Sequence, residues 1–111
     1  MKHHIIMFRI KSKSTKGHVD QLIEKHKDFL KSGYSKGWIL CSGTLVDKNQ
    51  GGIFVTRTPA EKQIKIILKN NEFLESKIVD YKIYKFKPSE CNPMVKDWFE
   101  LTENVSSQFY I

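Results

Sequence analysis

The feature that most constrains this fold is the stretch 19–34, whose apolar residues recur at the three- and four-residue spacing of an amphipathic helix. The apolar positions are Val19, Leu22, Ile23, Phe29 and Leu30. Such a stripe faces a core, and His26 lies inside it, four residues after Leu22 and three before Phe29. A titratable group therefore stands where an apolar residue is expected. His26 is either a hydrogen-bonded structural histidine at the edge of the stripe or a residue that lines a site.

Strands are predicted on both sides of this helix, in segments with alternating apolar residues or a β-branched and aromatic composition. They are 3–11, 38–45, 53–56 and 79–87. A second helix is predicted to start at a capping box, with Thr58 as cap, Pro59 at the first helical position and Glu61 completing the box. It ends near Asn70. Loops are expected at 11–17 and 47–52, and Gly33 and Gly37 are expected to stop the first helix.

The order strand, helix, strand, strand, helix, strand predicts an α+β, ferredoxin-like βαββαβ fold: a four-stranded antiparallel sheet with two helices on one face. The first strand, however, is apolar on both faces, with Ile6 and Phe8 on one side and Ile5 and Met7 on the other. The fourth strand is similar. Because two helices cover only one face of the sheet, we expect a homodimer in which the two helix-free faces pack together.

The length of 111 residues indicates one domain, and 40% hydrophobic residues indicate a globular one. We place this domain at 1–88. After Pro88 the composition changes, and residues 89–111 are expected to form a C-terminal extension, helical around Trp98 and Phe99, that packs on the body or on the dimer partner.

The net charge of +7 is unevenly distributed, because residues 89–111 carry −3 and residues 1–88 therefore carry +10. A basic body is compatible with an anionic ligand, with nucleic acid or with the acidic tail folding back, and the scattered lysines favour a solvated surface. No apolar run approaches the ~20 residues of a membrane span, and no signal peptide precedes the first strand. Cys41 and Cys91 form neither a disulfide framework nor a zinc site. We expect a cytoplasmic protein.

An ordered set of residues between positions 4 and 88 resembles the YciI-like (YCII-related) family of the dimeric α+β barrel superfamily. The matching residues are His26, Phe29, Leu30, Gly33, Gly37, Leu40, Ser42, Gly43, Gly51, Gly52, Phe73, Asp80, Tyr81, Ile83, Phe86 and Pro88. The resemblance implies a ferredoxin-like fold, a homodimer, and a cleft beside the first helix in which His26 is the catalytic residue.

The same resemblance places Ser42, Gly43, Asn71 and Glu72 around the substrate. Asn71 occupies the position where the family has an aspartate that partners the histidine, and Glu72 is one residue further on. An asparagine can orient an imidazole, but it does not stabilise an imidazolium as a carboxylate does.

The function indicated is cofactor-independent acid–base chemistry, of the isomerase or lyase type, on a small organic and perhaps anionic molecule. His26 would be the general acid or base, since an ordinary pKa of about 6.5 suits proton transfer near neutral pH. The alternative is a non-catalytic dimeric domain that binds a small molecule or another protein, which Asn71 favours.

RNA binding through the sheet is less favoured, because Gln50 stands where the RNA-recognition motif has a basic residue and dimerisation would close that face. No metal site is expected from His3, His4 and His18, which share no ligand spacing. Cys41 is expected to be buried, on the opposite sheet face from its neighbour Ser42.

Overall fold

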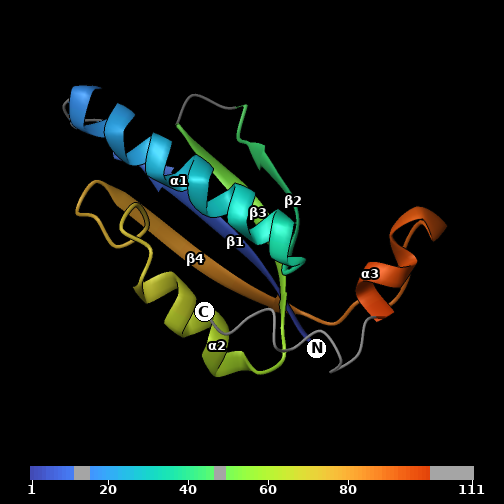
Figure 1. Ribbon diagram of the computed structural model, residues 1–111. Helices are drawn as coiled ribbons and strands as arrows, with labels where there is room; N and C mark the ends of the chain where they lie inside the picture. Colours follow the sequence, from blue (N-terminus) through green and yellow to red (C-terminus); the bar gives the residue numbers. More distant parts are fainter. Residues whose placement is uncertain (12–15, 47–49, 101–111) are drawn as a thin grey trace.

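The computed structural model describes residues 1–11, 16–46 and 50–100. Their elements follow the predicted order (Figure 1): β1 (Lys2–Ile10), α1 (Lys16–Lys36), β2 (Ile39–Thr44), β3 (Gly51–Thr58), α2 (Glu61–Lys69), β4 (Val79–Phe86), the short 3-10 turn η1 (Pro93–Val95) and α3 (Lys96–Glu100). The α+β ferredoxin-like fold, with a short C-terminal helix added to it, is confirmed.

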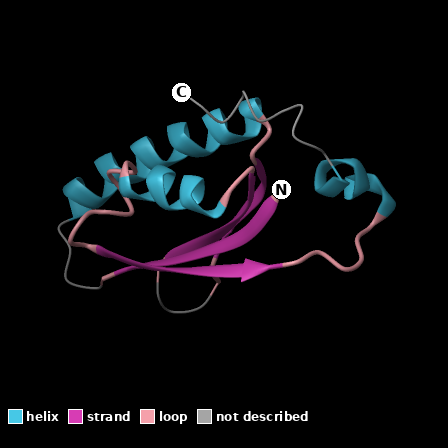
Figure 2. Ribbon diagram, turned by 90° about the horizontal axis from the view of Figure 1, so that it is seen from below, coloured by secondary structure: helices cyan, strands magenta, loops and turns pink. Residues whose placement is uncertain are grey.

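The four strands form one antiparallel sheet in the order β2-β3-β1-β4, so that β1 lies between β3 and β4. Figure 2 shows the sheet as one layer, with α1 and α2 both on the same side of it. The molecule thus has two layers, and its core lies between the helices and the sheet.

The strand register explains which side chains enter this core. Ile6 of β1 is directly opposite Phe54 of β3 and Ile83 of β4, so the three side chains share the helix-covered face. The apolar stripe of α1 and the buried face of α2 complete the core. Its buried members are Ile6, Phe8, Leu22, Trp38, Ile39, Phe54, Ile64, Leu68, Phe73, Leu74 and Val79.

The other face of the sheet carries no helix (Figure 2). Ile5 is paired with Val55 and with Tyr84, and Met7 is paired with Ile53, so these apolar side chains point to the helix-free face. Tyr84 is 46% exposed. The expectation that β1 and β4 are apolar on both faces is therefore met, and one of those faces is open in a single copy of the chain.

The first helix is longer than predicted and does not stop at Gly33. It continues to Lys36 and ends where Gly37 adopts a φ of 82°, a conformation that favours glycine. Gly33 is buried within the helix because α1 packs closely on β2 there. A Cβ at this position would lie 2.2 Å from the Cδ1 atom of Ile39.

Two other predicted boundaries were also wrong, because residues read as turn and cap signals belong to strand β3. Gly51 and Gly52 pair with Arg9 and Phe8, and glycine is needed there since a Cβ on Gly51 would lie 2.2 Å from the carbonyl oxygen of Phe8. Thr58 also remains in β3.

The second helix consequently begins at Glu61 rather than at Pro59, with Ala60 as its cap residue. Gln63 takes the role predicted for Glu61, since its Oε1 atom accepts a hydrogen bond of 2.7 Å from the Ala60 N–H.

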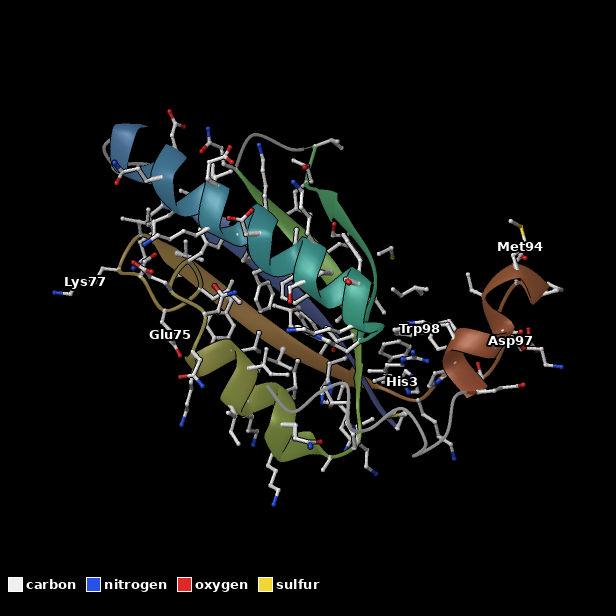
Figure 3. All side chains as sticks on the ribbon, in the orientation of Figure 1. His3, Glu75, Lys77, Met94, Asp97 and Trp98 are labelled. Carbon is white, nitrogen blue, oxygen red and sulfur yellow. The ribbon has the colours of Figure 1, made fainter. Side chains whose placement is uncertain are left out.

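The short helix α3 is attached to the end of the helix-free face, mainly through Trp98. The Trp98 indole N–H donates to the carbonyl oxygen of Gly37 at 3.1 Å, and the guanidinium of Arg57 lies 4.7 Å from the centre of the indole ring. His3 lies beside Trp98, with 5.9 Å between the ring centres (Figure 3). In the described part of the chain, no helix is long and apolar enough to cross a membrane.

Candidate functional site

His26 is enclosed by aromatic rings from four parts of the chain. The stacked ring of Phe73, which follows α2, is closest, with 4.6 Å between the ring centres. Phe8 of β1 meets the imidazole edge-on at 4.9 Å, and Phe54 of β3 and Phe29 of α1 lie at 5.9 and 6.0 Å. His26 is 7% exposed. We call these four phenylalanines and His26 the aromatic chamber.

This surrounding makes the imidazole neutral. Burial lowers the pKa of His26 to about 4, and no carboxylate among the described residues forms a hydrogen bond or ion pair with it to oppose that effect. The Nδ1 atom is buried and has no hydrogen-bond partner. An unpaired buried nitrogen is costly, so the chamber holds one unused hydrogen-bonding group.

The segment 71–73 reaches the chamber, but its two polar residues are engaged elsewhere. The Oδ1 atom of Asn71 accepts a hydrogen bond of 2.9 Å from the backbone N–H of Leu74 and so fixes the turn that follows. Glu72 is exposed and forms an ion pair with Lys25, with 2.8 Å between Nζ and the carboxylate. Of this segment, only Phe73 touches the imidazole.

Ser42 and Gly43 lie on opposite faces of the sheet. A register irregularity between Ile39 and Cys41 precedes them, after which Ser42 is paired with Phe54 and points to the helix side. Its hydroxyl shares a hydrogen bond with the hydroxyl of Tyr34 near the end of α1.

Gly43, paired with Ile53, belongs to the helix-free face. No hydrogen bond or ring contact joins Ser42 to His26 in the described residues. The expectation that Cys41 points away from Ser42 is met, but Cys41 is exposed, because in one copy of the chain nothing covers that face.

A second histidine was missed in the sequence. His4 was placed at the end of a strand, yet it is completely buried inside β1, on the helix side, near Glu61 at the start of α2. Its position could have been found, because His4, Ile6 and Phe8 alternate along one face of the strand. His3 is also buried, on the opposite face. Among the described residues no three potential ligands gather to form a metal site.

Comparison with known proteins adds a likeness of fold. No family model matches the sequence, and no curated protein matches it. Among solved structures, the chain is similar to 5-chloro-2-hydroxyhydroquinone dehydrochlorinase (TftG) from Burkholderia phenoliruptrix, determined in complex with 2,5-dihydroxybenzoquinone. The TM-score is 0.54 at 11% identity, over 78% of this chain and 95% of that one. At this identity the likeness bears on the fold alone.

Proposed function

We propose that this chain is a YciI-like member of the dimeric α+β barrel superfamily that performs cofactor-independent acid–base chemistry on a small organic molecule, with His26 as the group that takes up and returns the proton. The observation that carries the proposal is the unpartnered Nδ1 atom of His26 inside the aromatic chamber. A polar atom held without a partner among aromatic rings is suited to a ligand that brings both a ring and a hydrogen-bonding group.

The chemistry of the chamber favours a planar, hydroxylated ring. Phe73 and Phe8 offer stacking and edge contacts to such a ring. A base whose conjugate acid has a pKa of about 4 is weak, and it is best matched to a hydroxyl or enol that is itself acidic. The similar dehydrochlorinase was determined with a dihydroxybenzoquinone, a molecule of this kind. The anion formed is also compatible with a chain of net charge +7.

In this proposal the remaining expected site residues form the walls of the site. Asn71 fixes the turn that presents Phe73, and Glu72 ties that turn to α1 through Lys25. Ser42 and Gly43 are assigned to substrate contacts on β2.

Two further parts of the proposal concern the environment of the chain. The helix-free face, with Ile5, Met7 and Val55, would close against a second copy. A reducing cytoplasm suits the two exposed free cysteines, Cys41 and Cys91.

A non-catalytic function has one specific observation in its favour, which is that His26 has no carboxylate partner. In a histidine–carboxylate pair the acid stabilises the imidazolium formed after proton transfer. Here the Oδ1 atom of Asn71 is used by the turn, and Glu72 is paired with Lys25. The same chamber would then bind the planar molecule and release it unchanged.

The proposal can be tested with 2,5-dihydroxybenzoquinone as the probe. Its binding should shift the imidazole NMR signals of His26 and its own absorbance spectrum. The variants His26→Asn and His26→Leu should both abolish this response while keeping the free energy of unfolding within about 1 kcal/mol of the parent. Lys27→Gln, an exposed neighbour on the same helix, is the matched control and should bind normally.

Two results would contradict the proposal. One is a probe that leaves the His26 signals unchanged at saturation. The other is the pattern of an ordinary core histidine, in which leucine keeps or raises stability, asparagine lowers it, and neither alters binding. Incubation with hydroxylated quinones that can isomerise or eliminate then separates catalysis from binding, since a binder returns each compound unchanged.

A further inference from the structure

His4 occupies a position unlike that of His26, because it has an acidic neighbour. Its side chain is completely buried between β1 and the start of α2, and its Nε2 atom lies 3.6 Å from the Oε1 atom of Glu61. The other carboxylate oxygen of Glu61 is 2.6 Å from the Nζ atom of Lys85 on β4. Lys85 therefore holds the carboxylate in place, and the carboxylate faces one side of the imidazole.

The charges around His4 fix its state at neutral pH. Burial lowers its pKa, and the lysines at 85 and 65 act in the same direction, while Glu61 opposes them by hydrogen bonding and by charge. The pKa of Glu61 is itself lowered, chiefly by its hydrogen bond with Lys85. His4 is thus a neutral imidazole next to an ionised carboxylate. The favoured tautomer carries its proton on Nε2, toward Glu61, and leaves a lone pair on Nδ1.

Two buried polar atoms at this place have no partner. The Nδ1 atom of His4 has none, and neither has the Nε2 atom of Gln63 in the first turn of α2. The amide oxygen of Gln63 is engaged by the Ala60 N–H, which leaves its NH₂ group free to donate. The two atoms need opposite partners, since Nδ1 requires a donor and the amide requires an acceptor. A hydroxyl group is both, whereas a carboxylate would be repelled by Glu61 and could not donate.

We propose that His4, Glu61 and Gln63 form a second site, which binds the hydroxyl group of a small molecule. The hydroxyl donates to His4 Nδ1 and accepts from Gln63 Nε2. Glu61 is a positioning residue that orients the imidazole from its far side. The half-buried carboxylate of Glu61 also connects the site to solvent at the edge of α2.

This second site is separate from the aromatic chamber. On β1, His4 and Phe8 point to the same side but are four residues apart, or about 13 Å at the rise of an extended strand. Phe8 touches His26, whereas His4 lies next to Glu61 of α2. One planar ring cannot contact both histidines, so the two sites can be tested independently.

The test uses phenol as the probe and anisole, its methyl ether, as the matched control. Phenol should shift the imidazole ¹⁵N signal of His4 Nδ1, and anisole should not, because it has no proton to donate. The variant Gln63→Met keeps the length of the side chain and removes its donor, so the affinity for phenol should fall about tenfold. In His26→Asn the response of His4 should persist, which separates this inference from the proposed function.

The competing explanation is a buried water molecule, which would also satisfy both atoms. If phenol at saturation leaves the His4 signals unchanged while a long-lived water signal is seen beside His4, the site holds water only and the inference fails. Should Gln63→Met not fold, as judged by circular dichroism, Glu61→Gln replaces it. Its side chain reaches solvent, and losing its charge should weaken the phenol response at His4; an unchanged response would refute the role given to Glu61.

Discussion

At the scale of single residues, the chamber around His26 makes proton uptake unfavourable. Phe8, Phe54 and Phe73 remove water from the imidazole without supplying a countercharge. The histidine is therefore a hydrogen-bonding group of fixed, neutral charge rather than a switch near pH 7. This has a measurable consequence for stability.

We expect His26 to make the protein less stable in mild acid. Its pKa of about 4 in the folded chain lies below the value of 6.5 in an unfolded one. As the pH falls below 6.5 the unfolded state takes up the proton first, so stability is lost until the pH approaches 4. Between pH 7 and pH 5 this amounts to about 2 kcal/mol.

Urea denaturation of the parent and of His26→Leu at both pH values measures the effect. The leucine variant should lose that share of the pH dependence and keep the part due to His3, whose pKa burial also lowers to about 4. Equal pH dependence in the two proteins would show that His26 takes up a proton as easily in the folded state as in the unfolded one.

Asn71→Asp tests whether residue 71 addresses His26 as the resemblance implies. A carboxylate near the imidazole favours its protonated form, so the pKa of His26 should rise above its value in the parent. NMR titration of the imidazole signals in both proteins measures this. Asn71→Ala is the control, since it removes the cap on the Leu74 N–H and should cost about 1 kcal/mol of stability. Identical titration curves for parent and aspartate variant would remove residue 71 from the site.

The sequence located His26 well but not its surroundings. Its spacing from Leu22 and Phe29 was enough to place it on the buried side of α1. The rings that enclose it come from β1, β3 and the segment after α2, and such long-range neighbours leave no local pattern. The engagement of Asn71 with Leu74 was hidden for another reason, because a side chain can serve either its own turn or a distant partner.

At the scale of secondary-structure elements, period and composition predicted all the strands and both main helices. The boundaries failed where glycine and threonine served packing rather than turns. Gly33 lies inside α1 because Ile39 leaves no room for a side chain, and Thr58 stays paired in β3. A single sequence cannot distinguish a glycine that ends a helix from one that allows a close approach.

The element scale also yields a prediction for α3, which depends on Trp98. Trp98→Ala removes the indole hydrogen bond to Gly37 and the contact with Arg57, and should lower the free energy of unfolding by about 2 kcal/mol. Trp98→Phe keeps a ring over Arg57 and should lose only about 1 kcal/mol. Removing residues 89–111 should likewise lower the melting temperature. If thermal and urea denaturation are unchanged in all three, the extension does not stabilise the body.

At the scale of the whole molecule, the helix-free face predicts self-association. Light scattering at micromolar concentration should give the mass of a dimer. Val55→Lys places a charge on that face and should yield a monomer. Ile66→Lys makes the same change on α2, at a side chain that is 55% exposed, and should remain dimeric. A monomeric parent would contradict this assembly.

The position of β1 in the centre of the sheet also affects how the chain folds. Ile6 is paired with Phe54 on one side and Ile83 on the other, so neither neighbour of the central strand is close to it in sequence. Contacts of this range require large loops to close, which slows folding. During synthesis β1, apolar on both faces, leaves the ribosome well before β4 exists to pair with it. Until then its unpaired edge is open to other nascent chains, so this protein has reason to depend on chaperones at the very stage when its sheet is one strand short.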